Sequence, residues 1–305
     1  MGHDHGHSFA SAGMENRKPL VITFCLGLSV LVVQFVGAVL SGSLALLADT
    51  VHVFADVFGV GLALSAITLA ARPTKSRRTF GLYRLEIFAT VVNGVLLLSL
   101  SIFILVEAYG RWFTPATIDA PIMLAAATYG LVANGIGVWL LRRGASRSLA
   151  VKGAYLEVVS DALGSIGVVI AAVVLLTTGW ERIDVLVSIA IALFMIPRTL
   201  FLLRDAFNIL MESAPTGLDL DAVRTHMCDV PGVVSVHDLH AWTITSGMPS
   251  LSAHVTVDPT PFEQGKGEEI LVQLNVCLKE CFEIGHTTFQ LETAQQSATE
   301  ADTHP

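Results

Sequence analysis

Residues 150–177 read AVKGAYLEVVSDALGSIGVVIAAVVLLT, an apolar run of the length that crosses a lipid bilayer. Two acids, Glu157 and Asp161, interrupt this run four residues apart. An acidic side chain near the centre of a membrane helix costs roughly 2.5 to 3.5 kcal/mol on insertion scales. Because apolar residues continue on both sides of the pair, we expect these acids to line a cavity or to hold an ion.

Similar apolar runs occur five more times in the chain. They cover roughly residues 19–40, 44–71, 86–108, 121–141 and 183–205. The chain of 305 residues is 53% hydrophobic and only 14% charged, which lies outside the ordinary range of soluble domains. We therefore predict a polytopic α-helical membrane protein whose six transmembrane helices occupy residues 19–207 of the chain.

Lysine and arginine are distributed unevenly between the loops. They gather in residues 1–18, 72–84 and 142–152, whereas the loops on the other side contain only Arg111 and Arg182. Short loops rich in these residues stay in the cytoplasm. Six crossings leave both ends on one side, so we expect a multi-pass protein of the cell (inner) membrane with both termini in the cytoplasm.

The composition of the sequence changes from about residue 208, where charged residues become frequent again. Helical periodicity and strand-like alternation follow in turn: helices at 217–229 and 265–283, strands at 233–244, 250–258 and 286–292. The order αββαβ predicts a compact cytoplasmic α+β domain over residues 208–293, with its helices on one face of a sheet. We expect residues 1–18 to form a flexible tail that contains histidines, and residues 294–305 to be disordered.

Charge and motifs exclude two broad classes of function. A net charge of −8 argues against a nucleic-acid partner. No HExxH or nucleophile motif appears, so we do not expect an enzyme. The four cysteines show no paired spacing, which favours a reducing cytosolic side over a disulfide framework.

A displacement of 105 residues aligns SGSLALLADTVHVFADVFG (41–59) with SRSLAVKGAYLEVVSDALG (146–164), and seven of the nineteen positions are identical. His52 falls on Glu157, and Asp56 falls on Asp161. The displacement spans three helices, so the second and fifth helices should cross in opposite directions. Internal repeats of inverted topology are a recurrent plan of transporters, with the substrate site between the repeats.

The two pairs form a constellation of metal-ligating groups. His52 and Asp56, like Glu157 and Asp161, are four residues apart and so share a helix face. One imidazole and three carboxylates suit a tetrahedral divalent cation, zinc first, with cadmium, cobalt, iron or manganese as further candidates. The alternative is that both pairs only stabilise helix packing through hydrogen bonds.

This ligand set also suggests how transport is driven. The ligands bind metal only when they are deprotonated, so protons and metal ions compete for one site. Alternating access would then produce efflux of metal in exchange for protons. The alternative function is a membrane-tethered metal-sensing or metal-binding protein without transport, in which the soluble domain does all the work.

Four segments carry a resemblance to a known family. They are HVFAD (52–56), FGLYRLEIFATVVNGVLLL (80–98), EVVSDALGS (157–165) and HDLHAWTITSG (237–247). In these segments, and over residues 19–293 as a whole, the chain resembles the cation diffusion facilitator family of zinc, cadmium and cobalt efflux transporters. The resemblance implies that His52, Asp56, Glu157 and Asp161 bind the transported ion. Zinc-type members usually carry histidine where this chain has Glu157.

The resemblance further implies a homodimer whose cytoplasmic domain has a ferredoxin-like fold. That domain would bind zinc as a regulatory ion. Carried over by motif, the candidate cytoplasmic ligands are His237, His254, His286 and Glu292.

Overall fold

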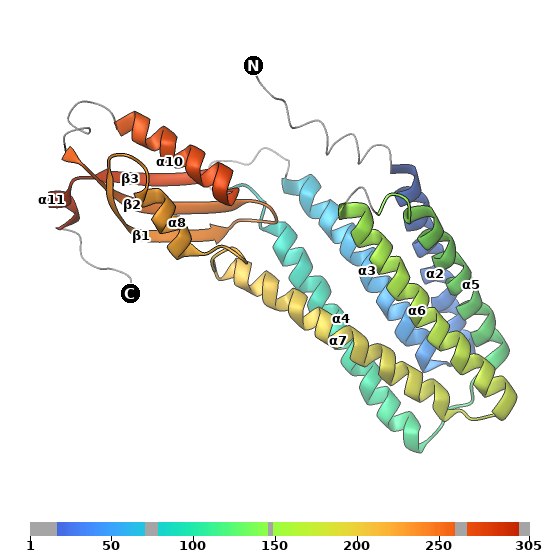
Figure 1. Ribbon diagram of the computed structural model, residues 1–305. Coiled ribbons are helices and arrows are strands. Elements are labelled where there is room, and N and C mark those ends of the chain that lie inside the picture. The colour runs from blue at the N-terminus through green and yellow to red at the C-terminus, as the bar shows by residue number, and fades with distance from the viewer. Residues whose placement is uncertain (1–16, 71–78, 146–148, 260–266, 299–305) are drawn as a thin grey trace. The chain divides into compact units, whose positions relative to one another are not determined.

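The computed structural model describes residues 17–70, 79–145, 149–259 and 267–298. Within these residues the six predicted membrane helices are confirmed, and each is long and apolar enough to cross a bilayer. They are α2 (Arg17–Ser41), α3 (Leu44–Ala70), α4 (Leu85–Phe113), α5 (Ala120–Leu141), α6 (Leu149–Thr178) and α7 (Arg182–Leu210) (Figure 1).

Some expected boundaries differ from the helix ends. Helix α2 begins at Arg17, inside the expected tail, and α7 continues to Leu210, beyond the expected domain end at residue 207. A short helix, α11 (Ala294–Ser297), occupies the start of the segment expected to be disordered, where the Thr293 side chain caps it by accepting a hydrogen bond from the Gln296 backbone. Residues 1–16, 71–78 and 299–305, which include most of the expected tails, lie outside the described residues.

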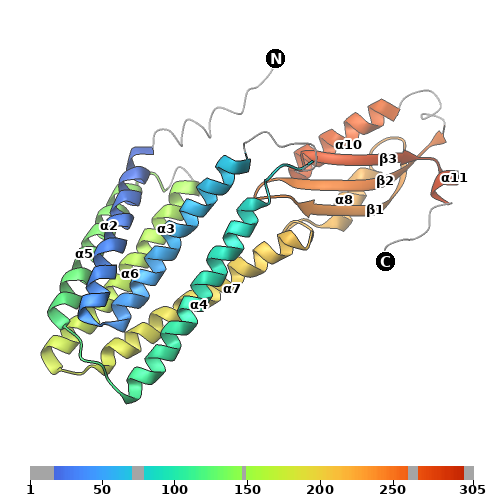
Figure 2. The same ribbon diagram turned by 180° about the vertical axis from the view of Figure 1, so that it is seen from behind.

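The chain divides into two compact units, and the first contains Met1–Ser65 with Ala89–Leu203. In this unit α5 packs against both α2 and α6. Helices α3 and α6 run in opposite directions, as the expected inverted repeat requires (Figures 1 and 2). Small side chains fill much of the interior between these helices, among them Ala45, Ala127 and Ala171, and they allow close packing in a membrane.

Large apolar side chains point outward from the same helices. Val39, Val106 and Phe201 are each more than half exposed. Membrane helices present such an outward apolar surface to lipid. In water, a large exposed apolar surface would favour aggregation.

A buried acid at the start of α7 caps the start of α3. The Asp184 carboxylate accepts hydrogen bonds from Ser43 Oγ at 2.5 Å, from the Leu44 backbone N–H at 2.8 Å and from the Ala45 backbone N–H at 3.1 Å. These groups would otherwise be unpaired donors at the positive end of a helix. The cap therefore fixes where α3 begins. It also fixes how far along the helix axis the polar residues of α3 lie from that start.

Glycine permits a close approach between α6 and α3. A Cβ atom built on Gly164 would lie 2.5 Å from Asp49 Oδ1, which is closer than atoms can pack. Gly59 of α3 is the residue that the displacement of 105 positions aligns with Gly164. A Cβ atom there would instead lie 2.7 Å from Asn93 Nδ2 on α4, so Gly59 accommodates a different helix.

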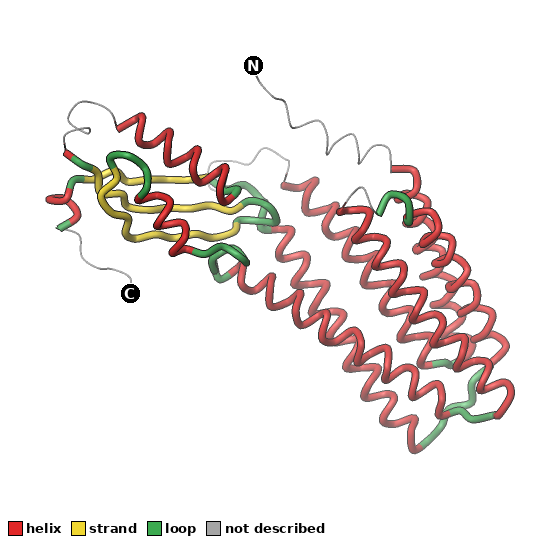
Figure 3. The backbone as a smooth tube through the Cα atoms, viewed as in Figure 1, coloured by secondary structure: helices red, strands yellow, loops and turns green. Residues whose placement is uncertain are grey.

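The second unit contains Ala66–Phe88 with Arg204–Pro305. Its elements after α7 are α8 (Leu220–Cys228), β1 (Val233–Thr243), β2 (Pro249–Val257), α10 (Gly267–Phe282) and β3 (His286–Glu292), which confirm the predicted αββαβ order. The three strands lie side by side in one sheet (Figure 3). Their order is β1-β2-β3, with β1 antiparallel and β3 parallel to β2. Helices α8 and α10 cover the same face of the sheet, as expected (Figures 1 and 2).

The core of this domain lies between the sheet and its two helices. Val223 and Met227 of α8 and Leu274 and Leu278 of α10 are fully buried against the strands. Alternate residues of β2, such as Leu251, point to this core because side chains alternate across a strand. The other residues of β2, His254 among them, are left on the opposite face.

We expect Gly164→Ala to destabilise the protein, because the added methyl group collides with the Asp49 carboxylate. Overpacking of this kind typically costs about 1–3 kcal/mol. Thermal unfolding of the purified protein in detergent micelles measures the effect. The matched control is Gly153→Ala on the same helix, where no described atom lies within 4 Å of the new Cβ. Equal unfolding temperatures for the two variants would refute the close approach.

Candidate metal centres

The polar residues of α3 and α6 converge inside the helical unit. His52 Nε2 lies 3.3 Å from Asp161 Oδ1 and 3.9 Å from Asp56 Oδ2. One ligand atom from each of these three residues can be chosen so that all lie within 4.8 Å of one another. Three of the four residues predicted as membrane ligands are therefore brought together, from two helices that are 105 positions apart in the sequence.

Helix geometry and burial explain this arrangement. His52 and Asp56 share a face of α3 because they are four residues apart. His52 and Asp161 are buried, at 6% and 8% exposure, and Asp56 is partly buried. Among the described residues, His52 Nε2, Asp56 Oδ2 and Asp161 Oδ1 have no hydrogen-bond partner. Buried polar atoms are normally satisfied, so three converging acceptors of this kind fit a cation.

The carboxylate one turn before His52 has a different role. Asp49 Oδ2 accepts hydrogen bonds from Gln34 Nε2 at 2.7 Å and from Ser165 Oγ at 3.0 Å. These bonds join α3 to α2 and to α6 inside the unit. Asp49 therefore fixes the relative position of the two helices that carry His52 and Asp161, and it does so without belonging to the ligand group.

Glu157 is the predicted membrane ligand that stands apart. Its Oε1 atom lies 2.5 Å from Arg198 Nη2 of α7, in an ion pair and hydrogen bond. It is also close enough to Asp56 to interact with that carboxyl group. Glu157 therefore lies at the margin of the group formed by His52, Asp56 and Asp161, where it is held by an arginine that the sequence interpretation overlooked.

A second group of ligands lies on the open face of the three-stranded sheet. His237 of β1, His254 of β2 and Glu292 of β3 offer ligand atoms within 4.8 Å of one another. His237 Nε2 lies 2.9 Å from Glu292 Oε1, and the two histidine rings are 5.4 Å apart. Two imidazoles and a fully buried carboxylate are a donor set that zinc binds in proteins.

Strand register brings these three residues together. His237 pairs directly with His254, and Glu292 pairs with Thr256, two residues further along β2. The register of β1 shifts between His237 and His240, where Asp238 adopts a left-handed backbone with φ of 47°. Asp238 there reaches both His240 at 2.8 Å and His254 at 3.7 Å.

His286 is not brought into this second group. It begins β3 and pairs with Ser250, whereas Glu292 ends the same strand. A strand rises about 3.3 Å per residue, so the six steps between them span roughly 20 Å. The ring of His286 instead lies edge-on to that of Phe80, at 6.3 Å. The sequence motif that suggested His286 does not show which end of β3 lies beside His237 and His254.

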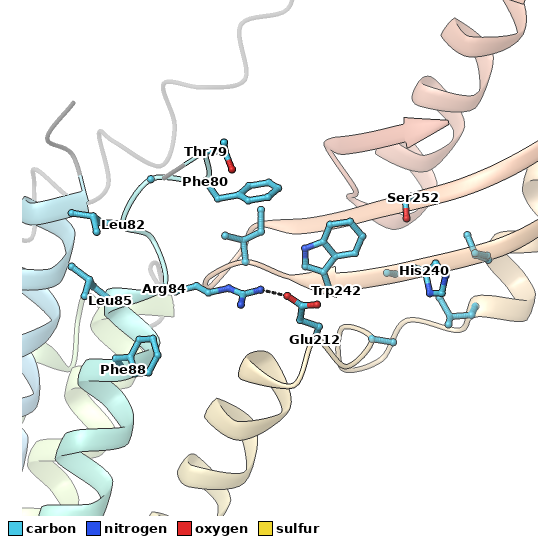
Figure 4. A pocket seen from close by; sticks show the side chains of 16 residues that line it. Thr79, Phe80, Leu82, Arg84, Leu85, Phe88, Glu212, His240, Trp242 and Ser252 are labelled. Carbon is cyan, nitrogen blue, oxygen red and sulfur yellow. Dashed lines mark hydrogen bonds and ion pairs between the residues drawn. The ribbon is translucent and has the colours of Figure 1, made fainter. Parts of the chain in front are cut away.

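A pocket of about 960 Å³ in the second unit is separate from both groups (Figure 4). Its lining combines apolar side chains with Trp242 and with the ion pair between Arg84 and Glu212, at 2.6 Å. His240 and Glu212 are the only histidine and acid among its described lining residues, and Glu212 is engaged by Arg84. The lining therefore does not provide a third set of metal ligands.

The sequence interpretation missed two residues that shape the membrane group. Arg198 carries the only charge in residues 185–203 of α7, and this isolation in an apolar helix was the available signal. Asp184, the cap of α3, lies at the start of its own helix, where an acid is so common that it attracts no notice.

Comparisons with known proteins extend over both units. The family model of the cation efflux transmembrane domain matches residues 20–211, and that of the cation efflux protein cytoplasmic domain matches residues 215–294. The metal cation efflux system protein CzcD of Cupriavidus metallidurans is 40% identical over 303 residues, which cover 99% of this chain and 93% of that protein.

Two further relatives have similar coverage. The cadmium, cobalt and zinc/H(+)-K(+) antiporter of Bacillus subtilis is 35% identical, over 96% of this chain and 92% of that protein. The zinc transporter ZitB of Escherichia coli is 36% identical, over 96% of this chain and 93% of that protein. Two domain models and near full-length relatives thus agree with the six helices and the αββαβ domain, and the chain belongs to the cation diffusion facilitator family, a family of transporters and not of enzymes.

Proposed function

We propose that this chain exports divalent metal ions, with zinc as the first candidate, in exchange for protons. The ion binds between α3 and α6. The observation that carries the proposal is the convergence of His52, Asp56 and Asp161, two buried groups and one partly buried group whose ligand atoms lie within 4.8 Å of one another. Charged and polar groups inside membrane helices are costly unless they serve an ion or a proton pathway.

The donor set supports zinc but admits other metals. One imidazole with carboxylates suits zinc, and carboxylate-rich sites also bind cadmium, cobalt, iron and manganese. Two of the relatives named above are described as a zinc transporter and as a cadmium, cobalt and zinc/H(+)-K(+) antiporter. Glu157, if it joins the ion, adds a third carboxylate to the imidazole, and this shifts the donor set towards harder cations.

Proton coupling follows from the chemistry of the same atoms. The imidazole nitrogen and the carboxylate oxygens that would bind metal also bind protons, so each ion displaces the other. In an alternating-access cycle the site takes up metal facing the cytoplasm and takes up protons facing a more acidic exterior. The opposite directions of α3 and α6 are the geometry that such a cycle uses in transporters with inverted repeats.

The wider organisation is proposed on the same basis. Both termini lie in the cytoplasm of the cell, because positive loop residues favour that side. Two copies form a homodimer, a proposal that the match to the cytoplasmic-domain model supports. His237, His254 and Glu292 bind a regulatory zinc ion there, because the buried Glu292 carboxylate lies among two imidazoles and fits such an ion.

His52→Ala and Asp161→Ala should each abolish zinc-dependent proton flux in proteoliposomes. Removing a direct ligand is expected to weaken binding by at least ~100-fold, since even the loss of an outer-shell partner costs 10–100-fold. The control is Ser160→Ala, next to Asp161, where the lost hydroxyl group donates to the backbone of its own helix at Leu156. Retained flux in both ligand variants would contradict the membrane site.

Zinc uptake into inverted membrane vesicles should depend on the direction of an imposed pH gradient. A vesicle interior more acidic than the bath reproduces the proposed driving force, so it should accelerate uptake, and a protonophore should remove the acceleration. The same assay with cadmium, cobalt, iron and manganese ranks the metals. Uptake that ignores the gradient would rule out proton exchange while leaving metal transport intact.

The second candidate function, a tethered metal sensor without transport, draws on the group at His237, His254 and Glu292. Under the transporter proposal, His237→Ala should remove one zinc-binding event in calorimetry of the full-length protein, while transport at saturating zinc persists. His286→Ala is the matched control and should leave binding unchanged, because its ring lies away from the group. Loss of every zinc-linked signal in His237→Ala would favour the sensor.

A further inference from the structure

An arginine of α7 faces the membrane metal group. Arg198 Nη2 lies 2.5 Å from Glu157 Oε1, and the guanidinium also interacts electrostatically with Asp56 and Asp161. The side chain of Arg198 is 50% exposed, so Arg198 does not belong to the packed core of the unit. An arginine in an apolar span is costly, so its place beside three acids calls for a reason.

Charge balance supplies this reason. Asp56, Glu157 and Asp161 carry three negative charges when all are ionised, one more than a divalent cation neutralises. Arg198 keeps its positive charge at all physiological pH values, so it supplies the missing charge. With arginine and metal both in place, the group is neutral. Without arginine, the metal-loaded group would retain a negative charge in an interior of low dielectric.

The geometry also decides where Glu157 stands. The three groups that come within 4.8 Å of one another exclude Glu157, whose Oε1 atom is engaged by the arginine. The charge-assisted hydrogen bond from Arg198 Nη2 to Glu157 Oε1 both matches the two charges and restrains the position of the carboxylate. Glu157 is thereby held at the edge of the group rather than being a permanent fourth ligand.

We propose that Arg198 is a positioning residue for the metal group: it neutralises and holds the Glu157 carboxylate, and so limits how tightly the group retains a divalent ion. This inference rests on the proposed transport function and deepens it. A free third carboxylate would bind the ion more tightly and release it more slowly. The ion pair between Arg198 and Glu157 therefore lowers the affinity of the group for the ion and raises the rate at which the ion is released.

The test is a double-mutant cycle on zinc transport into proteoliposomes, with KM and maximal rate measured separately. Arg198→Met frees Glu157, so both KM and the maximal rate should fall about tenfold. Glu157→Gln leaves the arginine without its partner and lowers the negative charge of the group, so KM should rise about tenfold. The double variant Glu157→Gln/Arg198→Met restores the charge, and both parameters should return to within about threefold of the wild type.

Two further variants separate this role from a merely structural one. Arg198→Lys keeps the charge and should recover most of the maximal rate, whereas Arg204→Met removes an exposed arginine from the same helix and should change neither parameter. If Arg198→Met does not fold, the comparison of Glu157→Gln with the double variant still decides the matter. A double variant with the KM of Glu157→Gln alone overturns the inference.

The proposed function is judged separately with His52→Ala. If His52→Ala keeps transport, the membrane site itself is wrong. If His52→Ala abolishes transport and Arg198→Met leaves both KM and maximal rate unchanged, the proposed membrane metal site is supported. Only the proposed role of Arg198 is then refuted.

Discussion

Carboxylates placed inside an apolar helix bundle must be neutralised, and this constraint organises the membrane unit. Asp49 accepts hydrogen bonds from Gln34 and Ser165 through its Oδ2 atom, and Asp184 accepts them from the donors at the start of α3. Glu157 is paired with Arg198. His52, Asp56 and Asp161 differ, because each keeps an atom without a hydrogen-bond partner among the described residues and the ligand atoms of the three converge. The described part of the unit thus pairs these other acids with hydrogen-bond donors or an arginine, and it gathers three ligand atoms into one group that fits a cation.

The supporting contacts explain how the ligands are held in place. The Asp184 cap determines where α3 begins, and the bonds of Asp49 tie α3 to α2 and α6. Gly164 lets α6 come close enough for the bond between Ser165 and Asp49. In the proposed transport cycle this frame would hold the three ligands in place while the ion binds and leaves.

The two candidate metal groups both bring several ligand atoms close together, but they do so with different secondary structure. On the helices, ligands four residues apart share one face, and a second helix supplies the rest. On the sheet, neighbouring strands place His237 beside His254, and β3 adds a carboxylate from its last residue. The membrane group combines one imidazole with two carboxylates, and the sheet group combines two imidazoles with one carboxylate.

Local pattern was enough to predict the six helices, the αββαβ order and the pairing of His52 with Asp56, because hydrophobic periodicity and four-residue spacing are properties of contiguous sequence. The convergence of α3 with α6 was also predictable, since a repeat and a resemblance linked their motifs. Arg198 and Asp184 acquire their roles only when α7 packs beside α3 and α6, and no local spacing connects residues 41 or 140 positions apart. That Glu292 and not His286 joins His237 and His254 has a related reason: the motif gives the residues of β3, but strand pairing decides which end of β3 lies beside those two histidines.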